Sequence, residues 1–374
     1  MKINEIITES KLMEGARIAH AEDLVFFEGS IGALRAINNL TALAKSKDTL
    51  SIKWDGRPAV VFGRNEEGEF IFTDKAGFGA KGYNGLYKSP KEFVAQKRSK
   101  GGDEDYLAKI VAIWPIVQAS VPASYRGFVL GDIMWFPGEL KETTKRFIFT
   151  PNTVTYEVNK DSELGHHIAQ SKAGMAVHTF YSAVGAEGQP LKNTAGLNIN
   201  GPLCILGPEI KNEATLQADK VKAKQITQYV KKNAKVVDAF LDETALREQK
   251  MAALPDLLYT YVNAQVKTRD LTNLYAKFGS WVQSNPKISK AMVGKVIAYS
   301  EQNATGLQAV FNIFDLITGL KLDVLHQLDS HEGTVIAHIA GERGGEGYVS
   351  SDEGGPIKLV NRANFSAVNF AKNS

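Results

Sequence analysis

The stretch TLSIKWDGRPAVVFGR, residues 49–64, alternates polar and apolar positions before an Asp-Gly pair and has a short apolar strand-like run, Ala59–Phe62, after it. Alternation with a period of two is typical of a β-strand, and Asp-Gly between two such runs is typical of a hairpin turn. A further run of this kind, EFIFTD at 69–74, follows the turn-forming segment Asn-Glu-Glu-Gly. The sequence therefore predicts an antiparallel meander in this region.

Further strand-like runs follow this region after one helical stretch. The runs at 125–136, 146–150 and 153–158 are rich in aromatic and β-branched residues. Between them and the meander, residues 105–120 have helical spacing, and we expect Pro115 to interrupt or kink that helix. Strands and helices are thus mixed along this part of the chain.

Two other parts of the sequence have helical periodicity. Residues 31–45 place apolar side chains at helical spacing, with Ser30 in a favourable N-cap position. Residues 209–330 are poor in glycine and rich in Lys, Gln, Ala and Leu, and the segments 218–241 and 288–302 have the helical period. We therefore expect a helical domain between the strands.

Strand patterns resume near the end of the sequence, at 333–339, 347–351 and 356–360. A lone hairpin there would be marginally stable, so we expect these strands to complete the earlier sheet. The sequence thus predicts an α+β fold in which a helical insertion interrupts one mixed domain. The expected segments are an N-terminal helical segment at 1–49, the first part of the mixed domain at 50–208, the helical insertion at 209–330 and C-terminal strands at 331–374.

The composition is that of a globular protein, with 44% hydrophobic and 23% charged residues among 374. Forty-four Lys and Arg against 41 Asp and Glu give a net charge of +3, which excludes a protein that binds polyanions by overall charge alone. The single cysteine, Cys204, excludes an internal disulfide and a cysteine-rich zinc site. Because no apolar stretch approaches ~20 residues, we expect a cytoplasmic protein without a membrane span.

Lys53 carries the clearest chemical signal. Lys53 and Asp55 stand two residues apart on a predicted strand, so their side chains should project to the same face, beside the turn at Gly56. A lysine held on a sheet can act as a covalent nucleophile. An ordinary surface lysine beside a hairpin turn would give the same short pattern.

The string Lys53-Trp54-Asp55-Gly56 resembles the nucleophile motif of the covalent nucleotidyltransferases, the superfamily of ATP-dependent DNA and RNA ligases and messenger-RNA capping enzymes. Later segments resemble further elements of that superfamily in the same order. The stretch at 361–366 is similar to the segment directly after the last of these elements in phage-type RNA ligases. The ordered segments are Asp74-Lys75-Ala76-Gly77, Gly127–Asp132, Thr155-Tyr156-Glu157, Glu332-Gly333-Thr334-Val335 and Ile357-Lys358-Leu359-Val360.

The resemblance implies an antiparallel-sheet nucleotidyltransferase domain, the ATP-grasp-like adenylation domain of ligases. It implies a polynucleotide ligase in which Lys53 takes AMP from ATP, with Mg²⁺ as the metal, and passes it to a nucleic-acid 5′-phosphate. A neighbouring 3′-hydroxyl then displaces AMP and seals the strand. The implied metal ligands are Glu332 and Asp132, and the implied nucleotide-binding residues are Asp55, Arg57, Lys75, Asp132, Tyr156, Glu332 and Lys358.

Several alternatives stay open. Glu346-Gly347-Tyr348-Val349 is a competing match to the element assigned to Glu332, and it lies closer to Lys358. Val360 stands where the superfamily often has a second lysine, which makes a non-catalytic nucleic-acid-binding or structural protein a rival interpretation. A third possibility is an enzyme that adenylylates a target other than a nucleic-acid end. The sequence does not separate RNA from DNA substrates or indicate the oligomeric state.

The helical insertion contains the densest basic stretch of the chain. Lys220, Lys224, Lys231 and Lys235 fall near one face of a predicted helix, with no acidic residue between Asp219 and Asp238. A solvated helix face and a clamp for the phosphate backbone of a nucleic acid both fit this pattern.

Histidines give a weaker signal. His166, His167 and His178 lack an acidic or cysteine partner at metal-ligand spacing, so we expect solvent-facing or hydrogen-bonded side chains.

Overall fold

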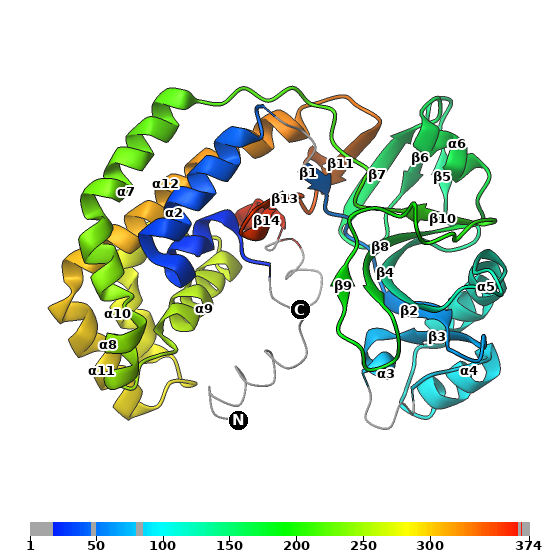
Figure 1. The fold of residues 1–374 in the computed structure, drawn as a ribbon, viewed down its shortest axis with the longest axis horizontal. Helices are drawn as coiled ribbons and strands as arrows, with labels where there is room; N and C mark the ends of the chain where they lie inside the picture. The colour runs from blue at the N-terminus through cyan, green and yellow to red at the C-terminus, as the bar shows by residue number, and fades with distance from the viewer. Residues whose placement is uncertain (1–17, 46–49, 80–84, 366–367, 369–374) are drawn as a thin grey trace. The chain divides into compact units, whose positions relative to one another are not determined.

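The computed structural model combines antiparallel sheets and helices in two compact units, as expected for the α+β class (Figure 1). It describes residues 18–45, 50–79, 85–365 and 368. The sheet unit comprises Ser51–Glu213 and His331–Glu346. The helical unit comprises Met1–Leu50, Ala214–Ser330 and Gly347–Ser374.

The sheet unit is built on a six-stranded sheet with the order β10-β8-β4-β2-β3, and β9 pairs with β8. All of its strand pairs are antiparallel except β10 with β8. Strand β4 lies in the middle, so its residues are flanked on both sides. The strands are β2 (Ala59–Arg64), β3 (Phe70–Asp74), β4 (Gly127–Trp135), β8 (Ala173–Tyr181), β9 (Gln189–Pro190) and β10 (Leu203–Leu206).

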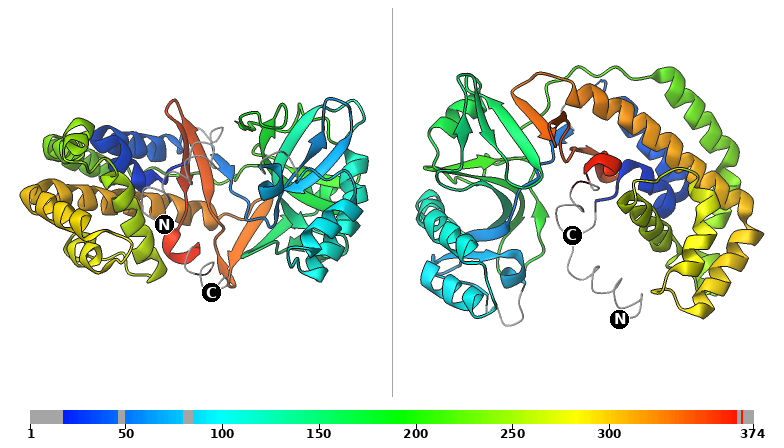
Figure 2. Two further views of the ribbon diagram at one scale, coloured as in Figure 1. Left: turned by 90° about the horizontal axis from the view of Figure 1, so that it is seen from below. Right: turned by 180° about the vertical axis from the view of Figure 1, so that it is seen from behind.

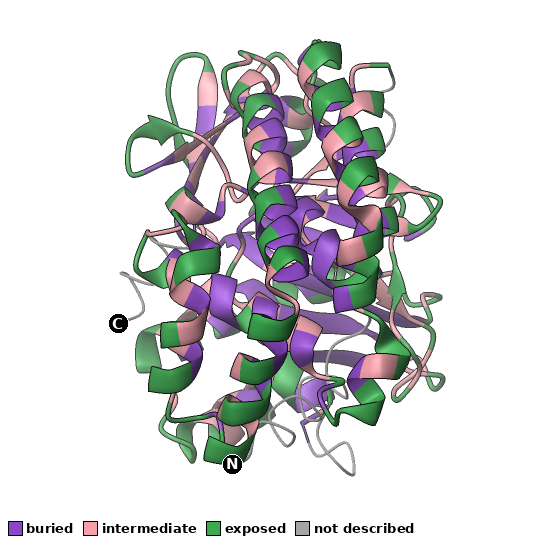
Figure 3. Ribbon diagram, turned by 90° about the vertical axis from the view of Figure 1, so that its left-hand side faces the viewer, coloured by how far each residue is buried: buried purple, intermediate pink, exposed green. Residues whose placement is uncertain are grey.

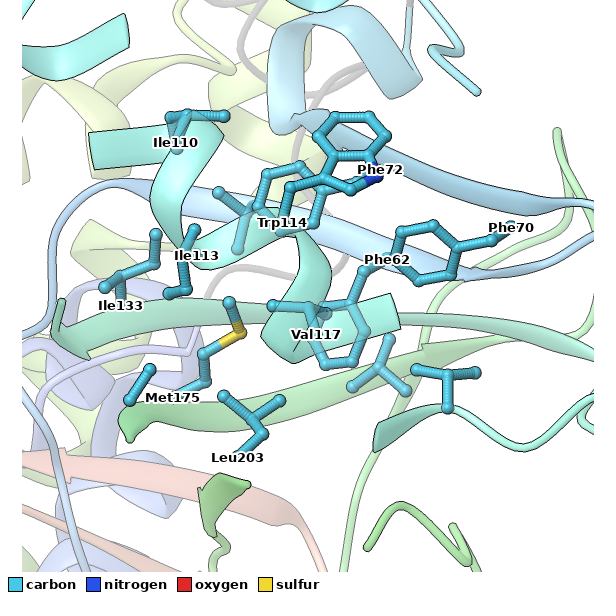
Figure 4. Close-up of a cluster of buried hydrophobic side chains, with 14 of the residues drawn as sticks. Phe62, Phe70, Phe72, Ile110, Ile113, Trp114, Val117, Ile133, Met175 and Leu203 are labelled. Atoms are coloured by element: carbon cyan, nitrogen blue, oxygen red, sulfur yellow. The ribbon is translucent and has the colours of Figure 1, made fainter. Parts of the chain in front are cut away.

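Helices α4 (Pro90–Arg98) and α5 (Glu104–Ser120) cover one face of this sheet (Figure 2). Alternate strand residues point into the core between them, where Phe72 and Trp114 pack with ring centroids 5.1 Å apart (Figure 4). Pro115 lies inside α5 without ending it. Because proline lacks an N–H, the helix loses one backbone hydrogen bond here, the one to the carbonyl of the half-exposed Val111.

The expected three-stranded meander is wrong at its first turn. Strands β2 and β3 form the predicted hairpin, but β1 (Leu50–Ile52) belongs to a three-stranded sheet with β13 (Tyr348–Asp352) and β14 (Gly355–Leu359). Residues 53–58 run beside β4 instead of closing a tight turn. Their last residues pair with it, because Arg57 donates its N–H to the Ile133 carbonyl at 3.0 Å and Pro58 accepts from the Ile133 N–H at 3.0 Å.

A second, five-stranded sheet of the sheet unit has the order β12-β11-β7-β6-β5. Its pairs are antiparallel, and Val154, Tyr156 and Val158 alternate as the buried positions of β7. Helix α6 (Glu163–Ala169) follows β7. The strands are β5 (Lys141–Glu142), β6 (Arg146–Phe149), β7 (Val154–Asn159), β11 (Val335–Ile339) and β12 (Glu342–Arg343).

The helical unit packs its longest helix, α12 (Ala304–Asp329), against both α2 (Leu24–Ala42) and α7 (Lys220–Phe240). These helices carry buried residues on one side and exposed residues on the other (Figure 3). Strands β13 and β14 pair within this unit. The remaining elements are η1 (Ala21–Asp23), α8 (Glu243–Glu248), α9 (Leu254–Lys267), α10 (Leu274–Ser284) and α11 (Lys290–Gln302).

Helix α2 is broken at Gly29, whose φ of 60° and ψ of −142° are not helical. The helix restarts at Ser30, the residue expected as an N-cap. The Ser30 N–H and hydroxyl both donate to the carboxylate of Asp238 on α7, at 2.8 and 2.7 Å. The N-terminal donors are therefore satisfied by a neighbouring helix, and a side chain at Gly29 would collide with Asp238.

Four charged side chains form a fully buried cluster inside the helical unit. Lys321 of α12 donates to Glu22 at 2.6 Å, and Arg362 donates to both oxygens of Asp23 at 2.8 and 2.7 Å. None of the four side chains is more than 4% exposed. Buried charges are tolerated when they are paired, so this cluster joins η1, α12 and the C-terminal segment into one core.

The C-terminal strands divide between the two units. Strands β11 and β12 complete the five-stranded sheet, whereas β13 and β14 lie with the helices. The segment expected at 331–374 is therefore split after Glu346, and the segment at 1–49 lies in the same unit as most of the segment at 209–330. None of the described helices has the length and apolar character needed to span a membrane.

Candidate active site around Lys53

Lys53 follows β1 and forms an ion pair with Glu346. Both side chains are mostly buried, with 24% of Lys53 and 17% of Glu346 exposed. Glu346 is the last residue of the sheet unit, two residues before β13 begins at Tyr348. The structure therefore brings Lys53 together with the competing glutamate of the sequence analysis.

Asp55 anchors the loop that carries Lys53. Its buried carboxylate accepts hydrogen bonds from the Asn152 amide at 2.9 Å and from the backbone N–H groups of Thr153 and Val154 at 2.7 and 3.1 Å. The Asp55 N–H donates to the Tyr156 hydroxyl at 2.6 Å. Both oxygens of Asp55 are thus occupied by the turn before β7, which gives this residue a role in positioning Lys53.

Gly56 holds the same loop against β4. A Cβ atom at this position would collide with the Cβ of Asp132 and lie 2.9 Å from the sulfur of Met134. Only glycine permits so close an approach. The Lys53 loop and Asp132 are therefore packed directly against each other.

Asp132 has a strongly perturbed carboxyl group. Burial raises the pKa of Asp132 to about 7, from 3.8 for an ordinary aspartate. The positive charges of Lys53 and Lys75 lower this pKa in part, whereas the nearby carboxylates of Glu346 and Asp55 raise it. Perturbation by burial together with specific charges is common at catalytic sites.

His178 lies beside Asp132 and occupies a β-bulge. The register of β4 and β8 shifts between Leu130 and Gly131, and His178 is the extra residue on β8. Its Nε2 atom lies 3.7 Å from Oδ2 of Asp132, and its Nδ1 atom lies 2.8 Å from the Thr179 hydroxyl. Bulges often redirect a side chain next to an active site.

His178 is neutral at physiological pH. Its pKa is lowered to about 4, first by desolvation and then by the positive charges of Lys53 and Lys75. Half of the side chain is nevertheless exposed. The His178–Asp132 contact is therefore not an ion pair near pH 7, and the imidazole keeps an available lone pair.

The other predicted site residues lie in different surroundings. Lys75 is exposed at the start of α3 (Lys75–Phe78), directly after β3. Arg57 has an exposed side chain. Tyr156 is fully buried and packs on Trp54, with ring centroids 4.8 Å apart, so it belongs to the core beneath the loop. Lys358 lies on β14, in the helical unit.

Glu332 does not pair with Lys53. It lies just before β11, is 75% exposed and forms an ion pair with Arg343 at 2.8 Å. The structure thus places Glu346, rather than Glu332, at the lysine. Among the residues that the structure describes, no group of three or more His, Cys, Asp or Glu side chains is arranged to hold a metal ion.

The four lysines predicted to bind nucleic acid all lie on α7. Lys220, Lys224, Lys231 and Lys235 are exposed, and none of them forms an ion pair with another described residue. The neighbouring Lys222 differs, because it pairs with Asp323 of α12. The exposed face of α7 is therefore positively charged.

Sequence reasoning named two residues of this site without assigning them to it. Glu332 was assigned to the motif with Glu346 as its competitor, and His178 carried no motif. The two glutamates have the same local pattern, and a bulge leaves no trace in a periodicity of two.

The fold and the site define a mixed α/β protein with a lysine–carboxylate centre on an antiparallel-sheet unit. Residues 16–374 match the model of the Family of unknown function (DUF6267), and the chain belongs to this family. No curated protein and no solved structure matches the chain.

Proposed function

We propose that this protein is an ATP-dependent polynucleotide ligase that acts through a covalent lysyl-AMP intermediate on Lys53. The observation that carries the proposal is the ion pair of Lys53 with Glu346, on a loop packed against Asp132. Lys53 and Asp132 also fall within the ordered segments that resemble covalent nucleotidyltransferases, and Glu346 lies in the competing match to one of them. Motif and geometry thus converge on one lysine.

The first chemical step requires a neutral lysine. A lysine in water is neutral in only about one molecule in a thousand near pH 7.5, a deficit of roughly 4 kcal/mol. Glu346 is the carboxylate in direct contact with Lys53, so it can accept the proton. The Lys53 amine then attacks the α-phosphorus of ATP, a P–N bond forms, and pyrophosphate leaves.

Two transfers complete the reaction. An oxygen of a nucleic-acid 5′-phosphate attacks the lysyl-AMP phosphorus, and the P–N bond to Lys53 breaks. A 3′-hydroxyl then attacks the activated 5′-phosphate, loses its proton and releases AMP. Because phosphoryl-type transfer depends mainly on positioning and charge, a rigid loop with lysines nearby suits this chemistry.

The carboxylates of the site fit Mg²⁺ bound together with ATP. Mg²⁺ commonly takes one or two protein carboxylates and fills its other positions with water and substrate phosphates. Glu346 and Asp132 are the candidates, because both lie near Lys53. When bound, Mg²⁺ would neutralise charge on the phosphates.

The exposed lysines of α7 are the proposed grip for the nucleic acid. Lysines with no acidic partner are free to contact phosphates, and such contacts release counterions. The helix would then bind the polyanion while the sheet unit performs the adenylyl transfer. This division of tasks predicts that self-adenylylation with free ATP does not need α7.

Intact-mass measurement after incubation with ATP and Mg²⁺ tests the proposal. The wild-type protein should gain the mass of one AMP group, and Lys53→Arg should gain none. Lys91→Arg is the matched control, because it changes an exposed lysine of α4 outside the candidate site and should keep the adduct. Absence of an adduct with any nucleotide or divalent metal, or an adduct on another lysine, would overturn the proposal.

A non-catalytic nucleic-acid-binding protein is the second candidate. It is favoured by Val360, which is buried where related enzymes often carry a second lysine. This candidate predicts nucleic-acid binding through α7 without an AMP adduct. An adduct that is never passed to a nucleic-acid end would instead indicate adenylylation of another target.

A further inference from the structure

We infer that Asp132 and His178 form a binding site for Mn²⁺ or a comparable transition-metal dication beside Lys53. The site's existence depends on the geometry of two strands, and only its use in adenylyl transfer rests on the proposed function. The inference adds His178, which no motif of the sequence singled out as a ligand.

The two donor groups come from neighbouring strands at a defined point of the sheet. In the regular register His178 would not share a face with Thr179, but the bulge in β8 places both beside β4. The Nε2 atom of His178 and the Oδ2 atom of Asp132 are 3.7 Å apart. Two ligands that each bind one ion at about 2.1 Å stand roughly 3 to 4 Å apart.

The second nitrogen of His178 is held as in known metal sites. Metal-binding histidines usually engage their other ring nitrogen in a hydrogen bond, which fixes the tautomer and the orientation of the ring. Here Nδ1 lies 2.8 Å from the Thr179 hydroxyl, which leaves Nε2 facing Asp132. Half of the imidazole is exposed, so an ion can reach it from solvent.

The donor set selects the class of metal. An imidazole is a poor ligand for Mg²⁺, whereas carboxylate with imidazole suits first-row transition metals. Catalytic zinc sites use three protein ligands, and the described residues supply no group of three here. Mn²⁺ accepts carboxylate and water readily, so the remaining positions can go to water or to phosphate oxygens.

Binding of Mn²⁺ alone, without ATP, tests this site. The loss of the free Mn²⁺ signal in electron paramagnetic resonance gives the dissociation constant for the wild type and for variants. His178→Ala and Asp132→Asn should each weaken Mn²⁺ binding by about 10-fold to 100-fold. Thr179→Val should weaken it by about 10-fold. His166→Ala, which removes an exposed histidine of α6, should bind Mn²⁺ like the wild type.

Two results would overturn the inference. One is a wild type that binds no Mn²⁺, and the other is an unchanged dissociation constant in folded His178→Ala or Asp132→Asn. Thermal unfolding of each variant separates loss of the site from loss of the fold.

The mass assay distinguishes this inference from the ligase proposal. Mn²⁺ binding as expected without any AMP adduct would retain the metal site and reject the ligase. An adduct on Lys53 together with unchanged Mn²⁺ binding in His178→Ala would retain the ligase and reject the metal site.

Discussion

Two charged clusters, one in each unit, differ in how far they are exposed to solvent. In the helical unit, Glu22, Asp23, Lys321 and Arg362 are at most 4% exposed and pair with one another. In the sheet unit, exposure rises from 17% for Glu346 to 49% for His178. The first cluster is closed to solvent, whereas the second is partly open to it.

A raised pKa does not distinguish the two clusters. Burial raises the pKa of Asp23 to about 6 and that of Asp132 to about 7. Asp23 nevertheless has a bidentate arginine, while Asp132 lies 3.7 Å from a neutral histidine. The two carboxyl groups therefore share a raised pKa but differ in solvent access and in the partner that lies next to each of them.

Breaking the buried cluster should give the largest effect on stability. Arg362→Met leaves Asp23 buried without its main partner, so we expect the free energy of unfolding to fall by about 3 to 5 kcal/mol. Urea unfolding measures this. Arg98→Met, which breaks an exposed pair with Glu104, should cost at most about 1 kcal/mol. An equal loss of unfolding free energy in Arg362→Met and Arg98→Met would contradict the expectation that the buried pair contributes more to stability than the exposed one.

The choice between the two glutamates gives the next largest effect. Glu346→Gln removes the partner of Lys53, and we expect adduct formation to slow by about 100-fold. Glu332→Gln should remain within about twofold of the wild type, because Glu332 pairs with Arg343 on the surface. Single-turnover mass measurements compare them. A slow Glu332→Gln with a normal Glu346→Gln would reverse the assignment.

Ionisation of Asp132 should lower the free energy of unfolding. Because its folded pKa is raised, the carboxyl stabilises the folded state below about pH 4, and this contribution is lost as pH rises through about 7. A change from 3.8 to about 7 corresponds to at most about 4 kcal/mol, and partial exposure reduces this to about 2 kcal/mol.

Asp132→Asn should therefore be more stable than the wild type at pH 8 by about 2 kcal/mol, and equally stable near pH 4. Urea unfolding across this range gives the difference at each pH. For Asp105→Asn, at an exposed site of α5, the difference should change little with pH. A pH-independent difference at Asp132 would show that its burial does not oppose ionisation.

The smallest expected effect concerns the exposed face of α7. Replacing Lys224, Lys231 and Lys235 with Glu should weaken nucleic-acid binding by about tenfold and flatten its salt dependence, for many sequences alike. Filter binding over a series of salt concentrations measures both. The AMP adduct should be unaffected. Unchanged affinity and salt slope would make α7 a better candidate for docking another protein.

The sequence predicted the class of fold because periodicity and turn residues are local signals. The β2–β3 hairpin and the helical period of α7 were both readable in this way. The Asp-Gly turn was misread because Asp55 bonds to residues about a hundred positions away. No local pattern reports such a contact.

The candidate site was only partly predictable for the same reason. Lys53 and Asp132 were both assigned from segments that resemble the covalent nucleotidyltransferases, and Asp132 lies within β4. The choice of Glu346 depends on which of the two glutamates the fold brings to Lys53, and the contact of His178 with Asp132 depends on the pairing of β8 with β4. The buried role of Tyr156 follows from packing that a single sequence does not encode locally.

The interleaving of the two units has a consequence for synthesis on the ribosome. The chain leaves the sheet unit after Glu213 and returns to it only at His331. Lys53 therefore emerges from the ribosome long before Glu346. The buried cluster of the helical unit can be completed only after Arg362, which is synthesised later still. Domains usually fold as units in the order of their synthesis. Here neither unit can complete its folding early in synthesis. A chain stalled before Glu346 would carry Lys53 without its carboxylate partner. The site would form only once translation has passed Glu346.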